Sequence, residues 1–215
     1  MDDQRVVPER SDATASPWVI VIAASAGGFQ GLLTILSTLP GEMPAAILVV
    51  LHRPPRAENG LVQIFSRYTR MPVQMAVDGQ PVEANVVYIA RSDQHLRLTL
   101  GGRFMYVDGA RIRHLRSSAN PLLESAAAAF GDRVIAVVLS GTGQDGTDGV
   151  RKVKAHGGIV IAQDCASSEH WDMPEAAVKS GAVDYVLPLV DIGSALDAVV
   201  HGRDIGRGSA AGSAT

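Results

Sequence analysis

The stretch WVIVIAASAGGFQGLLTILST, residues 18–38, indicates the fold class of the chain. Its first part, Trp18–Ala23, is apolar and rich in β-branched residues, and it lacks the alternating polarity of a strand with one face in water. A turn of small residues follows, and Phe29–Thr38 then has the pattern of a helix. A strand that is buried on both faces and leads directly into a helix is typical of an α/β fold with a parallel sheet.

The same alternation of short apolar runs and helical patterns continues along most of the chain. Further strands are predicted over Ala46–Leu51, Val134–Leu139, Ile159–Ala162 and Tyr185–Leu187. Further helices are predicted over Glu58–Tyr68, Pro121–Phe130, Gly146–His156, Pro174–Ser180 and Ile192–His201. We therefore expect the α/β class, with a doubly wound, mostly parallel sheet that carries helices on both faces.

One segment, Val73–Val107, has a different pattern. Short apolar runs in it are joined by tight polar or glycine-rich connections: Val86–Ala90, Leu96–Leu100 and Phe104–Val107. The last two, which Gly101 and Gly102 connect, are predicted to form a small antiparallel hairpin added to the sheet. We expect one domain over residues 17–201, with the polar residues 1–16 and the Gly/Ser/Ala-rich residues 202–215 as disordered arms.

The composition narrows the functional classes. The 215 residues, 47% of them hydrophobic and 19% charged, suit one globular domain. The formal net charge of −3 gives no electrostatic reason to expect a nucleic-acid partner. The single cysteine, Cys165, excludes an internal disulfide and a thiolate metal cluster and fits a reducing cytosol. The apolar runs are too short to cross a membrane, and the acidic residues before Trp18 argue against a signal peptide, so we expect a cytoplasmic protein without membrane insertion.

Three chemically suggestive side chains follow three of the predicted strands. Ser25 comes after Trp18–Ala23, His52 after the second strand, and Asp145 in the glycine-rich segment after Val134–Leu139. Because the carboxyl ends of parallel strands lie at one edge of a sheet, we expect these side chains to gather there. A hydroxyl, an imidazole and a carboxylate are the set needed for nucleophilic acyl transfer.

The turn after the serine adds to this interpretation. Gly27 and Gly28 allow a substrate to approach the backbone closely, and the helix that follows offers unpaired N–H groups for an oxyanion. Met173 is expected in a loop close to the site, which it would shape by packing. The histidines lack the spacing of metal ligands, so no metal is expected.

Each of the three side chains also has a structural explanation. Ser25 and Asp145 would serve as N-caps of the helices that follow them, and His52 would be satisfied by a backbone carbonyl. Asp164, which also follows a strand, is the main rival of Asp145 for the role of the carboxylate. A catalytic site needs the Ser25 hydroxyl near one ring nitrogen of His52 and Asp145 near the other. If Asp145 only caps a helix and His52 points into the core, a non-catalytic module that binds an anion or a protein is favoured.

Several segments resemble the catalytic domain of the bacterial chemotaxis protein-glutamate methylesterase (CheB) family. They are VIAASAGG, VVLHRPP, VVYIARSDQHL, AVVLSGTGQDGTDGV and GGIVIAQDCASSEHWDMPEAAV, in the family's order from Trp18 to about His201. The resemblance implies a serine esterase that removes methyl esters from glutamate side chains on the cytoplasmic helices of chemoreceptors and releases methanol. It also implies deamidation of certain receptor glutamines, without a metal or another cofactor.

Position by position, the resemblance implies a role for each candidate. Ser25 is similar to the family's nucleophile, His52 to its general base and later acid, and Asp145 to the carboxylate that orients the histidine. The family's oxyanion donors correspond to the backbone N–H groups of Ala26 and Thr142. The family often has asparagine where this chain has an aspartate after the strand Ile159–Ala162, which disfavours that rival carboxylate.

The chain departs from the family pattern at several positions. Ala26 stands where many members have threonine, and Arg91 stands where they have proline. The family's segment RHRPSVD corresponds to residues 114–120, which lack its proline and its aspartate. Only 17 residues precede the first predicted strand, so the receiver domain that is usual in the family is not expected within this sequence. These departures leave the substrate open between chemoreceptor helices, a similar methylated protein and a small-molecule ester.

Overall fold

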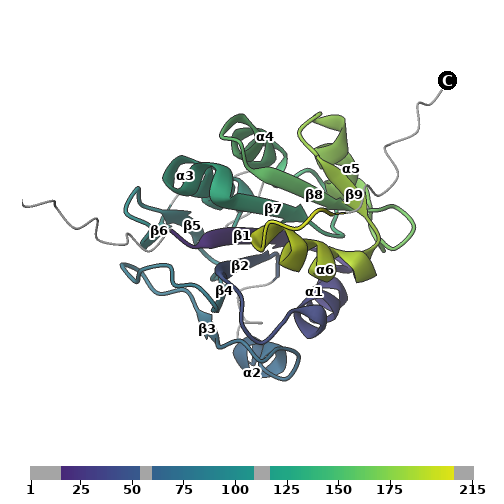
Figure 1. Cartoon of the computed structure of the whole chain (residues 1–215). Coiled ribbons are helices and arrows are strands. Elements are labelled where there is room, and N and C mark those ends of the chain that lie inside the picture. Colours follow the sequence, from purple (N-terminus) through teal and green to yellow (C-terminus); the bar gives the residue numbers. More distant parts are fainter. Residues whose placement is uncertain (1–15, 54–59, 109–116, 206–215) are drawn as a thin grey trace, which may run out of the picture.

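The computed structural model describes residues 16–53, 60–108 and 117–205. Within them, seven parallel strands form one sheet in the order β3-β4-β2-β1-β7-β8-β9 (Figure 1). The strands are β1 (Trp18–Ala24), β2 (Ala45–Leu51), β3 (Val73–Met75), β4 (Val87–Ile89), β7 (Val134–Val138), β8 (Ile159–Gln163) and β9 (Tyr185–Leu187). The prediction of a doubly wound α/β fold is confirmed.

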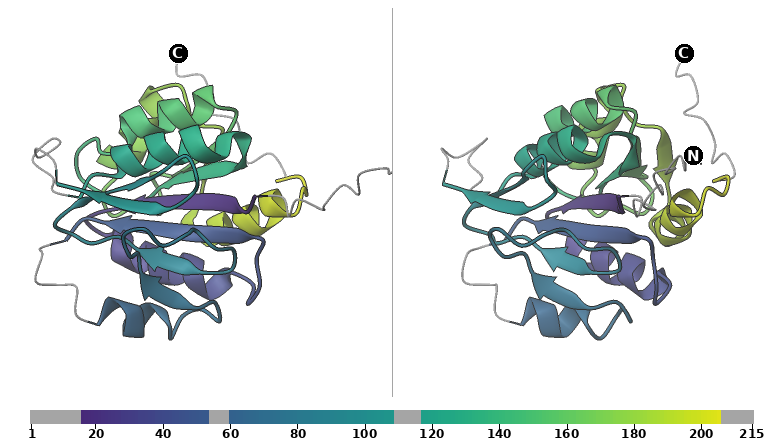
Figure 2. Two further views of the ribbon diagram at one scale, coloured as in Figure 1. Left: turned by 90° about the vertical axis from the view of Figure 1, so that its left-hand side faces the viewer. Right: turned by 60° about the vertical axis from the view of Figure 1, so that its left-hand side comes forward.

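Helices cover both faces of the sheet. They are α1 (Gly28–Thr38), α2 (Leu61–Phe65), α3 (Ala119–Phe130), α4 (Thr147–Ala155), α5 (Asp172–Lys179) and α6 (Leu189–Val200), with a 3₁₀ turn over Gly131–Arg133. The helices α1, α2 and α6 pack on one face, and α3, α4 and α5 pack on the other. Figure 2 shows the sheet between these two helical layers.

Each face of the sheet contributes to a separate hydrophobic core. In β1, Ile20 and Ile22 enter the core beneath α1 and α6, whereas Val19 and Val21 enter the core beneath α3 and α4. All four side chains are fully buried. Successive side chains of a strand point to opposite faces, so a strand between two cores has no polar face. This explains the continuous apolar run that indicates the fold in the sequence.

The segment Val73–Val107 divides between two sheets. Its strands β3 and β4 extend the main sheet, whereas β5 (His95–Leu98) and β6 (Phe104–Val107) form a separate antiparallel pair. The predicted hairpin is confirmed, but the prediction that it is added to the sheet is wrong. The apolar side chains of the hairpin pack onto the sheet from the side of α3, and the ring centroids of Phe104 and Tyr88 lie 4.7 Å apart. Burial of these side chains therefore places the hairpin over a face of the sheet.

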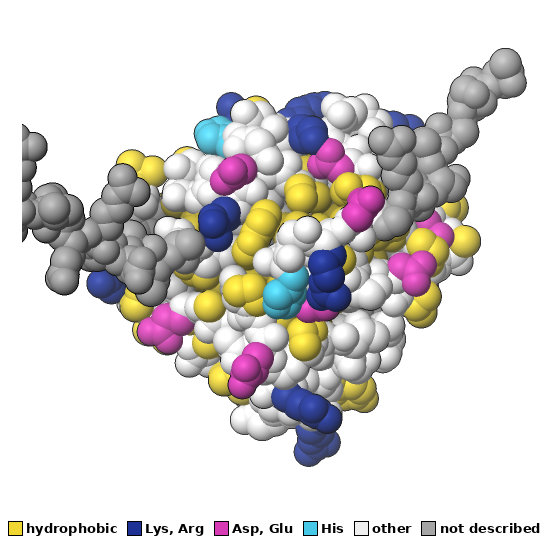
Figure 3. Space-filling view, viewed as in Figure 1, with side chains coloured by type: hydrophobic (Ala, Val, Ile, Leu, Met, Phe, Trp, Pro, Cys, Tyr) yellow, Lys and Arg dark blue, Asp and Glu magenta, His cyan; other side chains and the backbone are white. Residues whose placement is uncertain are grey.

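Four further findings concern the ends of the chain, the helix α2, the membrane and the surface. The predicted disordered arms lie outside the described residues, apart from residue 16 and residues 202–205. The helix predicted over Glu58–Tyr68 is observed as the shorter α2, and residues 58 and 59 lie outside the described part. Among the described residues, no helix combines the length and the apolar character that a membrane span requires. On the face drawn in Figure 3, basic and acidic side chains lie interspersed among hydrophobic ones.

The strand order reverses between β1 and β7. From this point the chain builds β2, β4 and β3 to one side and β7, β8 and β9 to the other. Ligand sites of open α/β sheets lie at the carboxyl ends of the strands beside such a reversal. Backbone hydrogen bonds join the loops there, from His52 N–H to Ala24 O (2.9 Å) and from Ser25 N–H to Ser140 O (3.0 Å). The topology thus fixes the loops after β1, β2 and β7 relative to one another.

Candidate active site

Ser25 lies in a tight turn between β1 and α1. A hydrogen bond of 2.9 Å from Gly28 N–H to Ser25 O closes the turn, and Gly27 adopts a left-handed conformation with a φ of 75°. A Cβ atom on Gly27 would lie 2.7 Å from Ser140 Oγ and 2.6 Å from Glu169 Cβ. Position 27 therefore requires glycine both for its backbone angle and for the close approach of its neighbours. The turn holds Ser25 half-buried at the edge of the sheet.

The loop after β7 packs directly against this turn. Ser140 donates its hydroxyl hydrogen to Ala26 O at 2.8 Å. A Cβ atom on Gly141 would lie 2.7 Å from Ser25 Cβ and 2.3 Å from Met173 Sδ. Met173 donates its N–H to Gly141 O at 3.0 Å. The absence of a side chain at Gly141 thus lets the serine turn and α5 meet over the end of β7.

The sequence predicts substrate contacts at Gly27, Gly28 and Met173. Met173 belongs to the first turn of α5 rather than to a loop, and its side chain is wholly buried. It therefore contributes to the site through packing. Gly28 is buried and Gly27 is half-buried, and substrate contact at these three positions stays a prediction.

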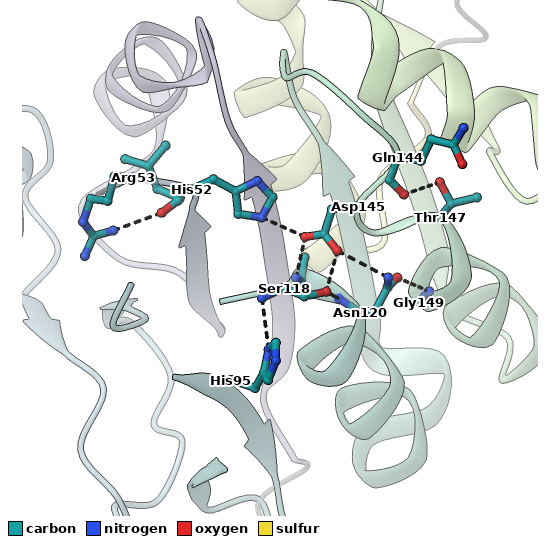
Figure 4. Close-up of polar contacts among 11 residues, drawn as sticks. His52, Arg53, His95, Ser118, Asn120, Gln144, Asp145, Thr147 and Gly149 are labelled. Carbon is teal, nitrogen blue, oxygen red and sulfur yellow. Dashed lines mark hydrogen bonds and ion pairs between the residues drawn. The ribbon is translucent and has the colours of Figure 1, made fainter. Parts of the chain in front are cut away.

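His52 and Asp145 contact each other at the carboxyl edge of the sheet. The Nε2 atom of His52 lies 2.8 Å from Oδ2 of Asp145, and the two side chains are 9% and 2% exposed. Figure 4 shows the imidazole pointing toward the carboxylate, which lies in the loop before α4. An ionised carboxylate only accepts hydrogen bonds, so Nε2 carries the proton of this bond. Nδ1 is then the ring nitrogen that can take a proton from another group.

The N-terminus of α3 also holds the carboxylate of Asp145. Its Oδ1 accepts from Ser118 Oγ at 2.5 Å and from Asn120 Nδ2 at 3.3 Å, and its Oδ2 accepts from Ala119 N–H at 2.7 Å. Ser118 is the N-cap of α3, so the positive end of the helix dipole faces the carboxylate. The spacing of Ser118 and Pro121 is typical of a helix N-terminus, but no sequence pattern indicates that this terminus meets Asp145.

The surroundings of Asp145 keep its carboxyl group ionised. Burial raises the pKa of this group, because a charge is disfavoured away from water. The hydrogen bond and the charge of His52, together with the donors Ala119 N–H and Ser118 Oγ, outweigh burial, and the pKa lies below its ordinary value of 3.8. Near neutral pH, Asp145 therefore carries a negative charge that orients the imidazole.

Three polar groups beside this pair have no partner within the described part of the chain. They are the Ser25 hydroxyl and the N–H groups of Ala26 and Thr142. Ala26 and Thr142 are both exposed residues. The structure thus joins His52 to Asp145 by a hydrogen bond and does not join Ser25 to His52. Hydrogen bonds of active sites are often long before substrate binds and tighten in the complex.

The contacts of Asp145 and Asp164 show which of these two aspartates has a structural role and which one meets His52. Asp145 does not cap α4, whose N-cap is Gly146 without a side-chain hydrogen bond. Asp164 closes a turn after β8, where it accepts from the N–H (2.9 Å) and the hydroxyl (2.5 Å) of Ser167. Of the two candidates, only Asp145 is bound to His52. Across the described ranges, no group of three or more His, Cys, Asp or Glu side chains is placed to hold a metal ion.

A groove opens between α4 and α5, and the end of the loop after β7 forms part of its lining. It has a volume of about 460 Å³, and its lining includes Gly143, Gln144, Arg151, Asp172, Glu175 and Lys179. Gly143 lies two residues beyond Gly141, which packs against the serine turn. The groove therefore offers a polar surface of mixed charge that includes part of the loop whose Gly141 packs against Ser25.

Comparisons with known proteins agree on one family. The family model described as CheB methylesterase matches residues 20–196. A protein-glutamate methylesterase/protein-glutamine glutaminase of Pyrococcus abyssi is 36% identical over 195 residues, which cover 87% of this chain and 53% of that protein. A relative from Leptospira interrogans is 33% identical over 173 residues, which cover 80% of this chain and 90% of that protein. The crystal structure of the Thermotoga maritima CheB methylesterase catalytic domain matches with a TM-score of 0.83 and 36% identity, over 86% of this chain and 99% of that chain. The chain spans about half the length of several curated relatives that it matches.

Proposed function

This chain belongs to the CheB methylesterase family, and we propose that it is a serine hydrolase that removes methyl esters from glutamate side chains of a methylated protein and releases methanol. One observation carries this function above all: His52 Nε2 lies 2.8 Å from Asp145 at the edge of the sheet that also bears Ser25. A paired imidazole and carboxylate beside a serine hydroxyl is the arrangement that activates a nucleophile for acyl transfer.

The first half of the proposed reaction forms an acyl-enzyme. Ser25 Oγ bonds to the ester carbonyl carbon while Nδ1 of His52 takes the hydroxyl proton. Asp145 remains ionised and stabilises the resulting imidazolium through the Nε2–H bond. The carbonyl oxygen becomes an oxyanion that the N–H groups of Ala26 and Thr142 are available to bind. The bond to the methoxy oxygen then breaks, and methoxide leaves as methanol with the proton from His52.

The second half returns the enzyme to its starting state. His52 takes a proton from water as the water oxygen bonds to the acyl carbon. The bond to Ser25 Oγ breaks, the serine regains its proton from His52, and the glutamate side chain leaves as a free carboxyl group. With a glutamine side chain as substrate, ammonia is the first leaving group and the second half is the same, which accounts for deamidation.

We propose a protein as the substrate because the relatives are named for protein-glutamate and protein-glutamine chemistry. The groove between α4 and α5 supports this choice. Its charged lining residues, Arg151, Asp172, Glu175 and Lys179 among them, offer partners of both signs to the polar side chains of a protein substrate. Cytoplasmic helices of a methyl-accepting chemoreceptor, or of a similar methylated protein, are the proposed partners.

Covalent trapping tests this function directly. A fluorophosphonate should add to Ser25, and mass spectrometry of the peptides should locate the adduct there. Ser25→Ala should abolish the adduct, whereas Ser37→Ala should keep it, because Ser37 is an exposed residue of α1 whose hydroxyl donates to Thr34 O.

Rates of hydrolysis of two esters distinguish the proposed protein methylesterase from a small-molecule esterase and from a non-catalytic binding module. The proposed function predicts that the chain hydrolyses a methyl-esterified receptor fragment with a higher kcat/KM than a generic aryl ester. Turnover of the aryl ester alone would assign a small-molecule substrate. No adduct and no turnover of either ester would instead support a non-catalytic binding module.

A further inference from the structure

The Asp145 carboxylate has more partners than the proposed reaction uses. We propose that Ser118 and Asn120 are positioning residues, which hold the Asp145 carboxylate in the one orientation that binds His52 through Nε2. This inference rests on the proposed function, because it assigns these residues a part in the same site. Within the described part of the chain, neither residue hydrogen-bonds to Ser25 or His52, so both are proposed to act through Asp145.

The hydroxyl of Ser118 has one direction in which to donate. Its Oγ accepts the N–H of Asn120 at 3.2 Å, and its own hydrogen is directed at Asp145 Oδ1, 2.5 Å away. The N–H of Ser118 is held in turn by Nδ1 of His95 at 3.1 Å (Figure 4). Ser118 and His95 are 1% and 4% exposed, so little water competes for these bonds. A chain of contacts therefore runs from the β5–β6 hairpin through Ser118 to the carboxylate.

Asn120 is fixed by the first turn of α4. Its Oδ1 accepts the N–H of Gly149 at 2.8 Å, which directs its Nδ2 hydrogens at Asp145 Oδ1, 3.3 Å away. Asn120 is 4% exposed. A Cβ atom on Gly149 would lie 2.6 Å from Leu123 Cβ, so the close approach of α3 and α4 that allows this bridge depends on glycine. Asn120 thus ties the carboxylate to two helices at once.

These donors matter because Asp145 is almost fully buried. A buried carboxylate without donors is neutralised more readily, and it is free to rotate about its terminal bond. Ser118 Oγ and Ala119 N–H both lower the pKa of Asp145 against the effect of burial. Because each oxygen of the carboxylate accepts from α3, the bond to His52 has a defined direction. Loss of a donor to Asp145 should therefore weaken the hydrogen bond between Asp145 and His52, while the residues that would contact a substrate stay unchanged.

Ser118→Ala tests the inference through the pH profile of ester hydrolysis. We expect kcat/KM at neutral pH to fall about ten- to hundredfold, since a hydrogen bond to a charged group is lost, while KM for the ester stays unchanged. The acid limb of the profile should move to higher pH, because Asp145 loses a donor that lowers its pKa. Ser118→Thr keeps the hydroxyl and should restore most of the wild-type rate and profile.

Ser125→Ala is the matched control. Ser125 is a buried serine of the same helix, and its hydroxyl donates to Pro121 O at 2.7 Å without contact to Asp145. This variant should lose thermal stability without any shift of the acid limb. If Ser118→Ala behaves in the same way, its role is structural only and the inference is wrong. Asn120→Ala removes the other donor to Asp145 Oδ1, so it should lower kcat/KM with KM unchanged, and it serves where Ser118→Ala does not fold.

A second measurement separates the inference from the proposed function. Carboxyl ¹³C titration by NMR follows the pKa of Asp145 without any substrate. The pKa should be higher in Ser118→Ala than in the wild type, whether or not the wild type hydrolyses an ester. An unchanged pKa would overturn the inference, whereas a wild type without turnover on any ester would overturn the proposed function alone.

Discussion

Replacement of Asp145 by asparagine keeps the shape of the side chain and removes its charge. Oδ2 of the carboxylate accepts from His52 and Ala119 N–H, and Oδ1 accepts from two further donors of α3. An amide offers one oxygen acceptor and one NH₂ donor in their place. If the amide oxygen stays with His52 and Ala119, the new NH₂ faces the NH₂ of Asn120, which Gly149 holds in place. One of these two NH₂ groups is then left without a hydrogen-bond acceptor in the protein interior.

The opposite rotamer has a different conflict. The new NH₂ would then face Ala119 N–H and Nε2 of His52, and only the tautomer with its proton on Nδ1 could accept from it. That proton would occupy the nitrogen that must take the proton of Ser25. A neutral amide also cannot stabilise the imidazolium of the proposed reaction. We therefore expect the kcat of Asp145→Asn for ester hydrolysis to fall by about 10⁴, as for the loss of a triad carboxylate.

The cost in stability is smaller than the cost in activity. One unsatisfied buried donor lowers the free energy of unfolding by about 1–3 kcal/mol, which urea unfolding followed by circular dichroism at pH 7 can measure. Asp148→Asn is the control, because Asp148 lies on the exposed side of α4 in a surface ion pair with Arg151. Asp148→Asn should change neither the kcat for ester hydrolysis nor the free energy of unfolding appreciably. Ester turnover by Asp145→Asn within tenfold of the wild type would refute the reasoning.

Three further predictions address packing and acid stability. Gly141→Ala places a Cβ atom 2.3 Å from Met173 Sδ, so urea unfolding should show a loss of about 1–3 kcal/mol, and ester turnover should fall with it; full activity would contradict the packing described. Gly149→Ala places a Cβ atom 2.6 Å from Leu123 Cβ and should lower the melting temperature, which calorimetry checks; an unchanged value would show that α3 and α4 can separate without cost. Folding lowers the pKa of Asp145, so its contribution to stability is present above 3.8 and is lost as the pH falls through the folded value. Urea midpoints measured across that range should therefore fall less in Asp145→Asn than in the wild type, and an equal fall would count against the lowered pKa.

Much of the fold could be predicted because the hydrophobic pattern of each strand is a property of a short local segment. The run Trp18–Ala23 has no polar face, and the structure places it between two cores. The same pattern indicates the other long strands, and parallel strands imply that the residues after them lie at one edge. The placement of Ser25, His52 and Asp145 at the carboxyl ends of β1, β2 and β7 follows from topology alone.

The remaining features depend on contacts between distant parts of the chain. The glycine turn predicts the β5–β6 hairpin from the sequence. The position of the hairpin over the sheet instead depends on the packing of Phe104 against Tyr88. The contact of α3 with Asp145 joins residues that are 25 to 27 positions apart. No periodicity or motif reports such a pairing, so Ser118 and Asn120 could be recognised only once the helix was placed in space.

Methanol release from a methyl-esterified receptor fragment tests the central claim most directly. The wild type should release methanol in proportion to the ester consumed, and Ser25→Ala should release none above the uncatalysed rate while it still folds and still binds the fragment. Methanol release by Ser25→Ala at the wild-type rate would contradict the claim that this serine, with His52 and Asp145 behind it, attacks the ester.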